Sequence, residues 1–186
     1  TGNNLLMMAW TDGRISAREV LRNWAIISLA NLVGALGLAA LMHLSGHTAM
    51  NQGSIGEQYV RIAAAKCALP FRTAFVSGVL CNMLVCLAVW MSFAGRTVVD
   101  KAIAIVPPIT AFVAAGFEHS VANMYFLPMG LLMKAAHPEI PGADGITVVA
   151  ALWNLVPVML GNLVGGSGFV ALVYYLAYRR TMRGDP

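Results

Sequence analysis

The sequence contains few charged residues. Only 11% of its 186 residues are Asp, Glu, Lys or Arg, whereas 59% are hydrophobic, and the mean hydropathy is +0.72. A soluble domain averages about 25% charged residues. Three long runs carry no formal charge, namely residues 23–44, 73–95 and 148–178. Each run exceeds the roughly 20 helical residues that cross a bilayer, so the sequence predicts an all-α integral membrane protein and excludes a soluble one.

The sequence also lacks the usual signatures of catalysis and of cofactor binding. Cys67, Cys81 and Cys86 show no CxxC spacing, and we interpret them as small packing residues. We find no nucleophile–base pair, phosphate loop or metal cluster, so neither an enzyme nor a bound cofactor is predicted. His43 and His47 are four residues apart, but no carboxylate or cysteine lies nearby, and we interpret both as interfacial residues.

The positions of the cations predict the topology. If the helices alternate in direction, eight of the twelve Lys and Arg residues fall on one side of the membrane: Arg14, Arg18, Arg22, Arg96, Lys101, Arg179, Arg180 and Arg183. The connections on the other side, residues 45–57 and 137–147, contain neither Lys nor Arg. The positive-inside rule therefore places the C-terminus in the cytoplasm, and the net charge of +4 reflects topology rather than nucleic-acid binding.

Five hydrophobic segments can be drawn along a single channel domain of residues 1–186. The first is a short segment, residues 1–11, and the second begins at a capping box, Ser16-x-x-Glu19, and reaches Leu44. The remaining three cover residues 59–94, with Pro70 near the start, residues 98–134 and residues 146–179. We expect all five to be helical.

The fourth segment is predicted to be a broken helix. Apolar stretches lie on both sides of the sequence Gly116-Phe117-Glu118-His119-Ser120, and neither stretch is long enough to cross a bilayer alone. Glycine weakens a helix, and a polar cluster at membrane depth is costly unless it faces protein or water. Broken helices of this kind are typical of transporter and channel sites. Glu118 and His119 are therefore predicted to mark the route of a small polar solute.

An internal similarity predicts two repeats. Asn-Leu-Val-Gly occurs at residues 31–34 and again at residues 162–165, each time inside a hydrophobic segment with small residues four apart. If the two segments are equivalent, Thr1 corresponds to the break at His119, and each repeat contains three helices. The chain begins at Thr1 without a methionine. We therefore expect a six-helix protein whose first helix and part of the second precede this sequence.

Several motifs resemble the formate/nitrite transporter family. They are Ala63-Ala64-Ala65-Lys66, residues 78–91 (GVLCNMLVCLAVWM), residues 116–124 (GFEHSVANM), the opening Thr-Gly-Asn-Asn and residues 161–166 (GNLVGG). The resemblance covers essentially the whole chain. It implies an aquaporin-like bundle of six helices made of two inverted repeats, with broken helices, a pore in each protomer and a pentameric assembly. It also implies a channel for small monovalent weak-acid anions in the cytoplasmic membrane of a prokaryote.

The same resemblance assigns roles to individual residues. It implies that His119 is the central pore histidine, with Thr1 and Asn82 as polar neighbours and Glu118 as electrostatic support. Lys66 is similar to a lysine that concentrates anions near the entrance. Phe112 and Val85 match positions that narrow the pore with apolar side chains.

Other interpretations stay open from the residues themselves. Lys66 alone reads as an interfacial cation, and Asn82 could simply bridge two helices. Phe117 and the sequence Leu127-Pro128-Met129-Gly130 resemble the formate-type members of the family more than the nitrite-type members, and nitrite and hydrosulfide are the alternatives. A haem-binding membrane anchor is a different class of function, but bis-histidine ligation needs two histidines at similar depth, and the sequence offers only His119 there.

Overall fold

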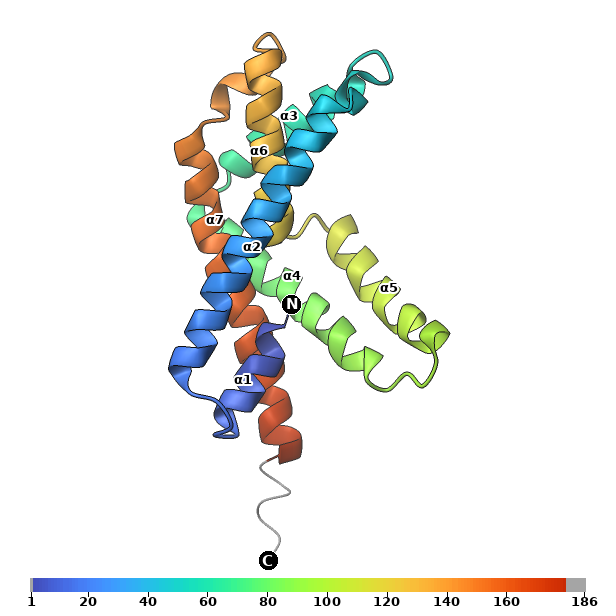
Figure 1. The fold of residues 1–186 in the computed structure, drawn as a ribbon, viewed down its shortest axis with the longest axis vertical. Coiled ribbons are helices and arrows are strands. Elements are labelled where there is room, and N and C mark those ends of the chain that lie inside the picture. The colour runs from blue at the N-terminus through green and yellow to red at the C-terminus, as the bar shows by residue number, and fades with distance from the viewer. Residues whose placement is uncertain (1, 180–186) are drawn as a thin grey trace, which may run out of the picture. The chain divides into compact units, whose positions relative to one another are not determined.

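The computed structural model describes residues 2–179, and the described part of the chain contains helices and no strands. This confirms the all-α prediction (Figure 1). The elements are α1 (Asn3–Thr11), α2 (Ala17–Leu44), η1 (His47–Ala49), α3 (Ser54–Cys67), α4 (Phe71–Ser92), α5 (Val98–Ala114), α6 (Ser120–Ala136), η2 (Ala143–Gly145), α7 (Val148–Leu163), η3 (Val164–Leu172) and η4 (Tyr175–Arg179).

Three helical stretches are long and apolar enough to cross a membrane. They are Ala17–Leu44, Phe71–Ser92 and Val148–Tyr178, and they correspond to the three uncharged runs of the sequence. In hydrocarbon a backbone must satisfy its own hydrogen bonds, and an uninterrupted helix does so. The prediction of spanning helices is confirmed for these three runs by length and composition.

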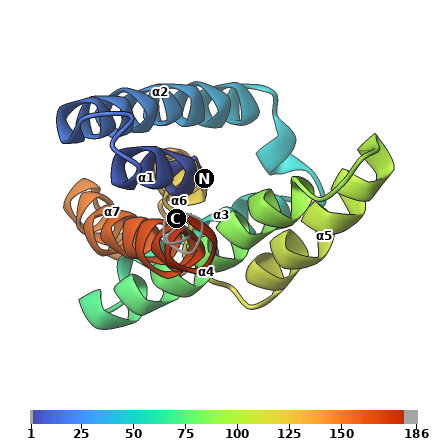
Figure 2. The ribbon, with the colours of Figure 1, turned by 90° about the horizontal axis from the view of Figure 1, so that it is seen from below.

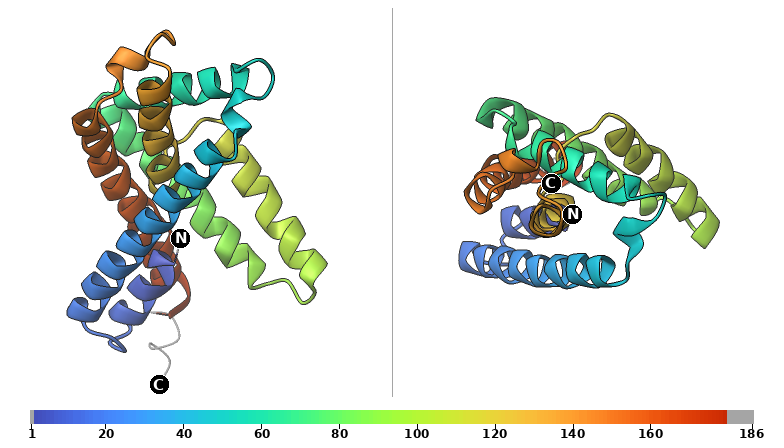
Figure 3. Two further views of the ribbon diagram at one scale, coloured as in Figure 1. Left: turned by 45° about the horizontal axis from the view of Figure 1, so that its top comes forward. Right: turned by 90° about the horizontal axis from the view of Figure 1, so that it is seen from above.

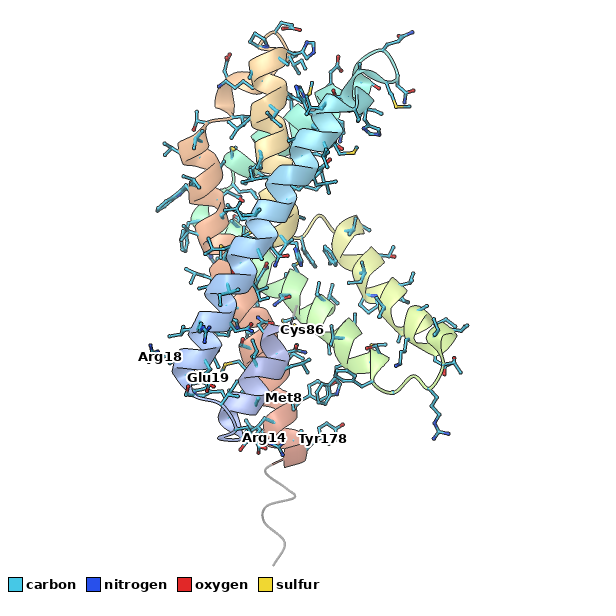
Figure 4. All side chains as sticks on the ribbon, in the orientation of Figure 1. Met8, Arg14, Arg18, Glu19, Cys86 and Tyr178 are labelled. Atoms are coloured by element: carbon cyan, nitrogen blue, oxygen red, sulfur yellow. The ribbon has the colours of Figure 1, made fainter. Side chains whose placement is uncertain are left out.

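Two capping boxes fix the beginnings of α2 and α5. At α2 the Ser16 hydroxyl accepts a hydrogen bond from the Glu19 amide at 3.3 Å, and the Glu19 carboxylate accepts one from the Ser16 amide at 2.8 Å. This box was predicted, and Figure 4 shows Glu19 with Arg14 and Arg18 around the connection that precedes α2. Thr97 and Asp100 form the second box, which the sequence analysis did not identify.

The third predicted segment, residues 59–94, consists of two helices. It divides into α3, which ends at Cys67, and α4, which begins at Phe71. Pro70 explains the division, because proline lacks an amide donor and disfavours helical backbone at the residue before it.

The break in the fourth segment is confirmed. α5 ends at Ala114 and α6 begins at Ser120, and Gly116 in between has a φ of +67°, a conformation that favours glycine. The fifth segment continues beyond Leu163 as π-helix, from Val164 to Leu172, which no sequence pattern predicted. The glycines at 165, 166 and 168 weaken the preference of this stretch for a regular α-helix.

The chain forms two compact units. Unit 1 contains Thr1–Ala25, Phe75–His119 and Val158–Pro186, and unit 2 contains Ile26–Ala74 and Ser120–Pro157. The prediction of a single channel domain over residues 1–186 stays a prediction.

Glycine determines the helix packing of unit 1. A Cβ atom on Gly161 would overlap the backbone carbonyl oxygen of Phe75, and one on Gly165 would overlap that of Val79, so α4 can approach the end of α7 and η3 only because both positions lack a side chain. α1 packs against η3, and Figures 1 and 2 both show the dark-blue α1 beside the red end of the chain. α5 follows α4 and runs back in the opposite direction (Figure 3), and it contains no buried residue.

Unit 2 is built on the contact between α3 and α6 (Figure 1). Its hydrophobic core consists of Val60, Ala63, Met133, Ala143 and Ile146. Lys134, in the last turn of α6, connects this helix to the segment that contains Asp144 and Ile146. Its ammonium group donates to the carbonyl oxygens of these two residues, at 3.2 Å and 2.8 Å respectively.

Candidate functional site

His119 lies at the end of the break between α5 and α6. Its half-buried imidazole stacks on the ring of Phe112 from α5, with 5.8 Å between ring centroids and 27° between planes. The break places the histidine next to the helix that ends before it, which an uninterrupted helix would not do. The structure therefore brings together two of the predicted site residues, His119 and Phe112.

The backbone of Glu118 is held from both sides. Its amide donates to the Ser77 hydroxyl of α4 at 3.0 Å, and its carbonyl oxygen accepts from the side-chain amide of Asn162 at 3.0 Å. The residue is only 4% exposed. Buried backbone groups outside a helix require such partners, because an unpaired buried amide or carbonyl costs free energy.

Asn82 belongs to a network of three buried asparagines. Its Nδ2 donates to the backbone carbonyl of Asn162 at 2.5 Å and to Oδ1 of Asn3 at 3.4 Å, and Nδ2 of Asn3 donates to the same carbonyl at 3.4 Å. The side chain of Asn162 also donates to the carbonyl of Gly78 at 2.9 Å. α1, α4 and the end of α7 are therefore joined by carboxamides, and the interpretation of Asn82 as a helix bridge holds for its contacts within unit 1.

Gly166 and Cys86 complete the surroundings of this network. A Cβ atom on Gly166 would lie 2.5 Å from both Oδ1 of Asn3 and Nδ2 of Asn82, so only glycine leaves room for the two carboxamides. The Cys86 thiol lies 3.5 Å from Oδ1 of Asn3, and Figure 4 shows Cys86 beside α1. These contacts favour a packing role for Cys86, as expected from the sequence.

Lys66 belongs to unit 2, in the last turn of α3. Its carbonyl oxygen accepts a hydrogen bond at 2.9 Å from Nδ2 of Asn154 on α7, whose Oδ1 in turn accepts one at 2.8 Å from Nδ2 of Asn123 on α6. The backbone at the carboxyl end of α3 is thereby fixed.

The structure gives less information on the two remaining predicted residues, Val85 and Thr1. Val85 is 4% exposed and lies one turn after Asn82 on α4. Thr1 lies outside the described residues. The roles of Thr1, Asn82, Lys66, Glu118, His119, Phe112 and Val85 in a pore stay predictions.

Sequence reasoning missed the contacts of Asn3, Ser77 and Asn162. Asn3 and Asn162 were noticed only as parts of motifs, and Ser77 was not singled out. Their contacts join positions 41 to 159 residues apart, and no local pattern reports them. The one available signal was a polar residue within each apolar segment, which is expensive in a membrane unless it is paired.

The arrangement offers carboxamides and a serine hydroxyl, together with the imidazole of His119 and the carboxyl group of Glu118. No group of three or more His, Cys, Asp or Glu side chains that could hold a metal ion occurs within residues 2–179. Carboxamides can donate to an anion or accept from a protonated acid without carrying charge themselves.

Comparison with known proteins identifies the family. The family model described as formate/nitrite transporter matches residues 1–176. The formate channel FocA of Escherichia coli strain K12 is 40% identical over 190 residues, covering 97% of this chain and 67% of that protein. The formate channel FocA of Haemophilus influenzae is 41% identical over 179 residues, covering 90% of this chain and 62% of that protein. The chain thus spans about two thirds of the length of these relatives.

Solved structures agree with the sequence comparison. A pentameric formate channel with formate bound has a TM-score of 0.81 and 36% sequence identity, covering 90% of this chain and 69% of that chain. An FNT family ion channel has a TM-score of 0.83 and 31% identity, covering 95% and 67% respectively. These similar proteins are channels rather than enzymes, and the predicted fold class is confirmed by their likeness. The chain therefore belongs to the formate/nitrite transporter family.

Proposed function

We propose that this chain forms a membrane channel for small monovalent weak-acid anions, with formate as its main substrate. The relatives from Escherichia coli and Haemophilus influenzae are named formate channels, and a similar solved structure holds formate. Phe117 and the sequence of residues 127–130 also favour formate. Nitrite and hydrosulfide are the alternative substrates.

The observation that carries this proposal is the position of His119. It follows the buried Glu118 in a helix break within an otherwise apolar segment, and its ring lies against Phe112. Placing an ionisable residue within a membrane-spanning segment costs free energy. A residue found there is therefore a candidate for a functional role.

In the proposed mechanism His119 lets the anion pass as, or together with, a proton. A bare anion cannot shed its water to enter an apolar constriction, whereas the neutral acid can. Imidazole has an unperturbed pKa of about 6.5, so it holds or releases a proton near neutral pH. The fully buried titratable side chains within the described part of unit 1 are Glu118, Cys81 and Cys86.

The remaining predicted residues serve this passage. Lys66 raises the anion concentration at the entrance, and Thr1 and Asn82 offer hydrogen bonds that orient the ion. Phe112 and Val85 narrow the path, which forces dehydration before the anion meets His119. Glu118 supports the electrostatic arrangement around the imidazole.

The proposed assembly is a homopentamer in the lipid bilayer. The similar formate channel structure is pentameric. The bacterial relatives support a location in the cytoplasmic membrane of a prokaryote, and the cation distribution supports a cytoplasmic C-terminus.

A substrate series in vesicles tests the proposed channel. The purified protein is reconstituted into liposomes, and the flux of formate, nitrite and hydrosulfide is compared by stopped-flow measurement. We expect formate to cross fastest and empty liposomes to remain impermeable. Equal flux with and without protein for all three anions contradicts the proposal, and faster nitrite flux assigns the channel to the alternative substrate.

His119→Phe tests the role of the imidazole. We expect the variant to fold but to lose proton-coupled formate uptake by on the order of 100-fold, the usual contribution of a positioned proton donor. The matched control is His137→Phe, because His137 is exposed in a connection, where it pairs only with Glu139 in the described contacts. The control should transport like the unmodified protein. Unchanged pH-dependent uptake by His119→Phe contradicts the proposed mechanism.

A further inference from the structure

The orientation of His119 depends on the peptide group before it. The carbonyl of Glu118 and the Cα of His119 belong to one planar peptide unit, so fixing that carbonyl limits the direction in which the histidine leaves the backbone. In the sequence, His119 is followed directly by α6, which begins at Ser120. The residues of the break, with the left-handed Gly116, belong to neither α5 nor α6.

Asn162 supplies one constraint on this peptide. Its Nδ2 donates one hydrogen bond to the Glu118 carbonyl at 3.0 Å and another to the Gly78 carbonyl at 2.9 Å. A carboxamide nitrogen carries two N–H donors, so both are used, each on a different element. The side chain cannot rotate without breaking both bonds in a buried place where water does not replace them, since Asn162 is 7% exposed.

The backbone of Asn162 is held as well. Its carbonyl oxygen accepts from Asn82 at 2.5 Å and from Asn3 at 3.4 Å. On the opposite side of Glu118, the Ser77 hydroxyl accepts from the amide. Asn162 and Ser77 therefore hold residue 118 at its carbonyl and at its amide, and Gly78 next to Ser77 shares the same carboxamide.

Few other side chains can replace this arrangement. Serine and threonine have a single donor, and an ionised aspartate has none and would repel both carbonyl oxygens. Glutamine has the right group on a longer stem, but the helix end around Gly161 lies too close to Phe75 for the backbone to shift. The geometry thus requires a short carboxamide at position 162.

We propose that Asn162, together with Ser77, is a positioning residue that orients His119 through the peptide group between Glu118 and His119. The inference rests on the proposed function of His119 in transport. Asn162 acts through the backbone and does not itself transfer a proton, so its loss misdirects the imidazole while the imidazole is still present. A misplacement of about 1 Å at a reacting group can reduce a rate on the order of 100-fold.

The test compares Asn162→Ser and Ser77→Ala with the unmodified protein in liposomes. The first measurement is formate flux as a function of pH, and the second is the imidazole ¹⁵N resonance of His119 by solid-state NMR, assigned by its loss in His119→Phe. We expect both variants to shift the pH midpoint of flux and the His119 resonance, with Asn162→Ser reducing flux more. Asn23→Ser, an exposed asparagine in the first turns of α2, is the matched control and should change neither.

The His119→Phe background separates a positioning role from a purely structural one. If Asn162 acts through His119, Asn162→Ser causes no further loss of flux in that background. A further loss there, or an unchanged pH midpoint and resonance in both single variants, overturns the inference. Should Asn162→Ser fail to assemble, Ser77→Ala decides alone by the same two readouts.

Failure of the proposed function gives a different result. If His119→Phe keeps normal pH-dependent uptake, the role of the histidine is wrong whatever Asn162 does. If His119→Phe loses uptake but Ser77→Ala and Asn162→Ser behave like the unmodified protein, only the positioning role is wrong.

Discussion

Carboxamides are the main polar groups in the interior of unit 1. Asn3, Asn82 and Asn162 connect three helical elements without burying a formal charge. A buried charge would cost several kcal/mol unless it were paired, and it would also attract or repel an anion permanently. Neutral carboxamides avoid both effects. Apart from Glu118, the buried polar side chains of the described part of unit 1 are therefore neutral.

Part of this arrangement was predictable from single residues. His119, Glu118 and Asn82 stood out because each is polar within an apolar segment. The partners of Asn82 did not, because hydrogen bonds between side chains and carbonyls far apart in sequence leave no periodic trace. Asn162 in particular could be recognised as part of a motif but not as a donor to Glu118.

Gly166→Ala tests the packing of the asparagine network. The added methyl group would lie 2.5 Å from Asn3 and Asn82 side-chain atoms and 2.8 Å from the Cys86 sulfur. We expect a loss of about 1–3 kcal/mol in the free energy of unfolding, the usual cost of overpacking. Thermal unfolding in detergent measures this loss.

Gly168→Ala is the control for that change. It lies two residues further along the same helical stretch, and a Cβ atom there would meet nothing within 4 Å. We expect no loss of stability. Equal melting temperatures for the two variants would show that the network tolerates the methyl group.

At the level of elements, local chemistry determines where helices begin and end. The Ser16–Glu19 box was predicted and is present, and Pro70 separates α3 from α4 as proline chemistry requires. Pro70 was noted near the start of the segment of residues 59–94, but the exact ends of the two helices at Cys67 and Phe71 were not predicted. The π-helical stretch after Leu163 had no signal, since its apolar residues and glycines fit an ordinary membrane helix equally well.

Gly116→Ala tests the break between α5 and α6. Gly116 has nothing within 4 Å of its Cβ position, so a methyl group there meets no steric obstacle, but its φ of +67° is unfavourable for alanine. We expect a loss of about 1 kcal/mol in the free energy of unfolding, together with reduced formate flux if the break shifts.

The matched change is Gly34→Ala in α2. Its Cβ position is equally open, but its backbone is helical, so alanine should leave stability unchanged or raise it by a few tenths to about 1 kcal/mol. Unfolding measured in the same detergent distinguishes the two substitutions. A gain of stability in both would mean that Gly116 does not need its left-handed conformation.

At the scale of the molecule, composition and motifs predicted more than individual contacts did. The uncharged runs predicted membrane helices, and the motifs predicted the family. The packing inside each unit was not predictable, because it depends on which backbone atoms meet. Gly161 against Phe75 in unit 1 and Gly130 against Ala63 in unit 2 are contacts of that kind. A glycine in a sequence indicates that another segment can approach closely, but it does not identify that segment.

Native mass spectrometry of the protein released from detergent tests the assembly. We expect a species of five times the 19.8 kDa mass of the chain, because the similar formate channel is pentameric and interfaces within a fold family are commonly shared. Cross-linking in liposomes before extraction serves as the control for dissociation by detergent. A monomer as the main species in both experiments would contradict the proposed assembly.

The close contact of α4 with Gly161 and Gly165 also affects how variation in this family should be interpreted. Any side chain at either position would overlap a backbone carbonyl, and a backbone has no rotamers with which to yield. Both positions must therefore resist every substitution, for a reason that lies in helix packing and not in ion binding. Intolerance to mutation is accordingly no guide to the pore in this region. A position can be intolerant to mutation because two backbones pack against each other there, as well as because it lines the pore. Only transport measurements distinguish these two causes.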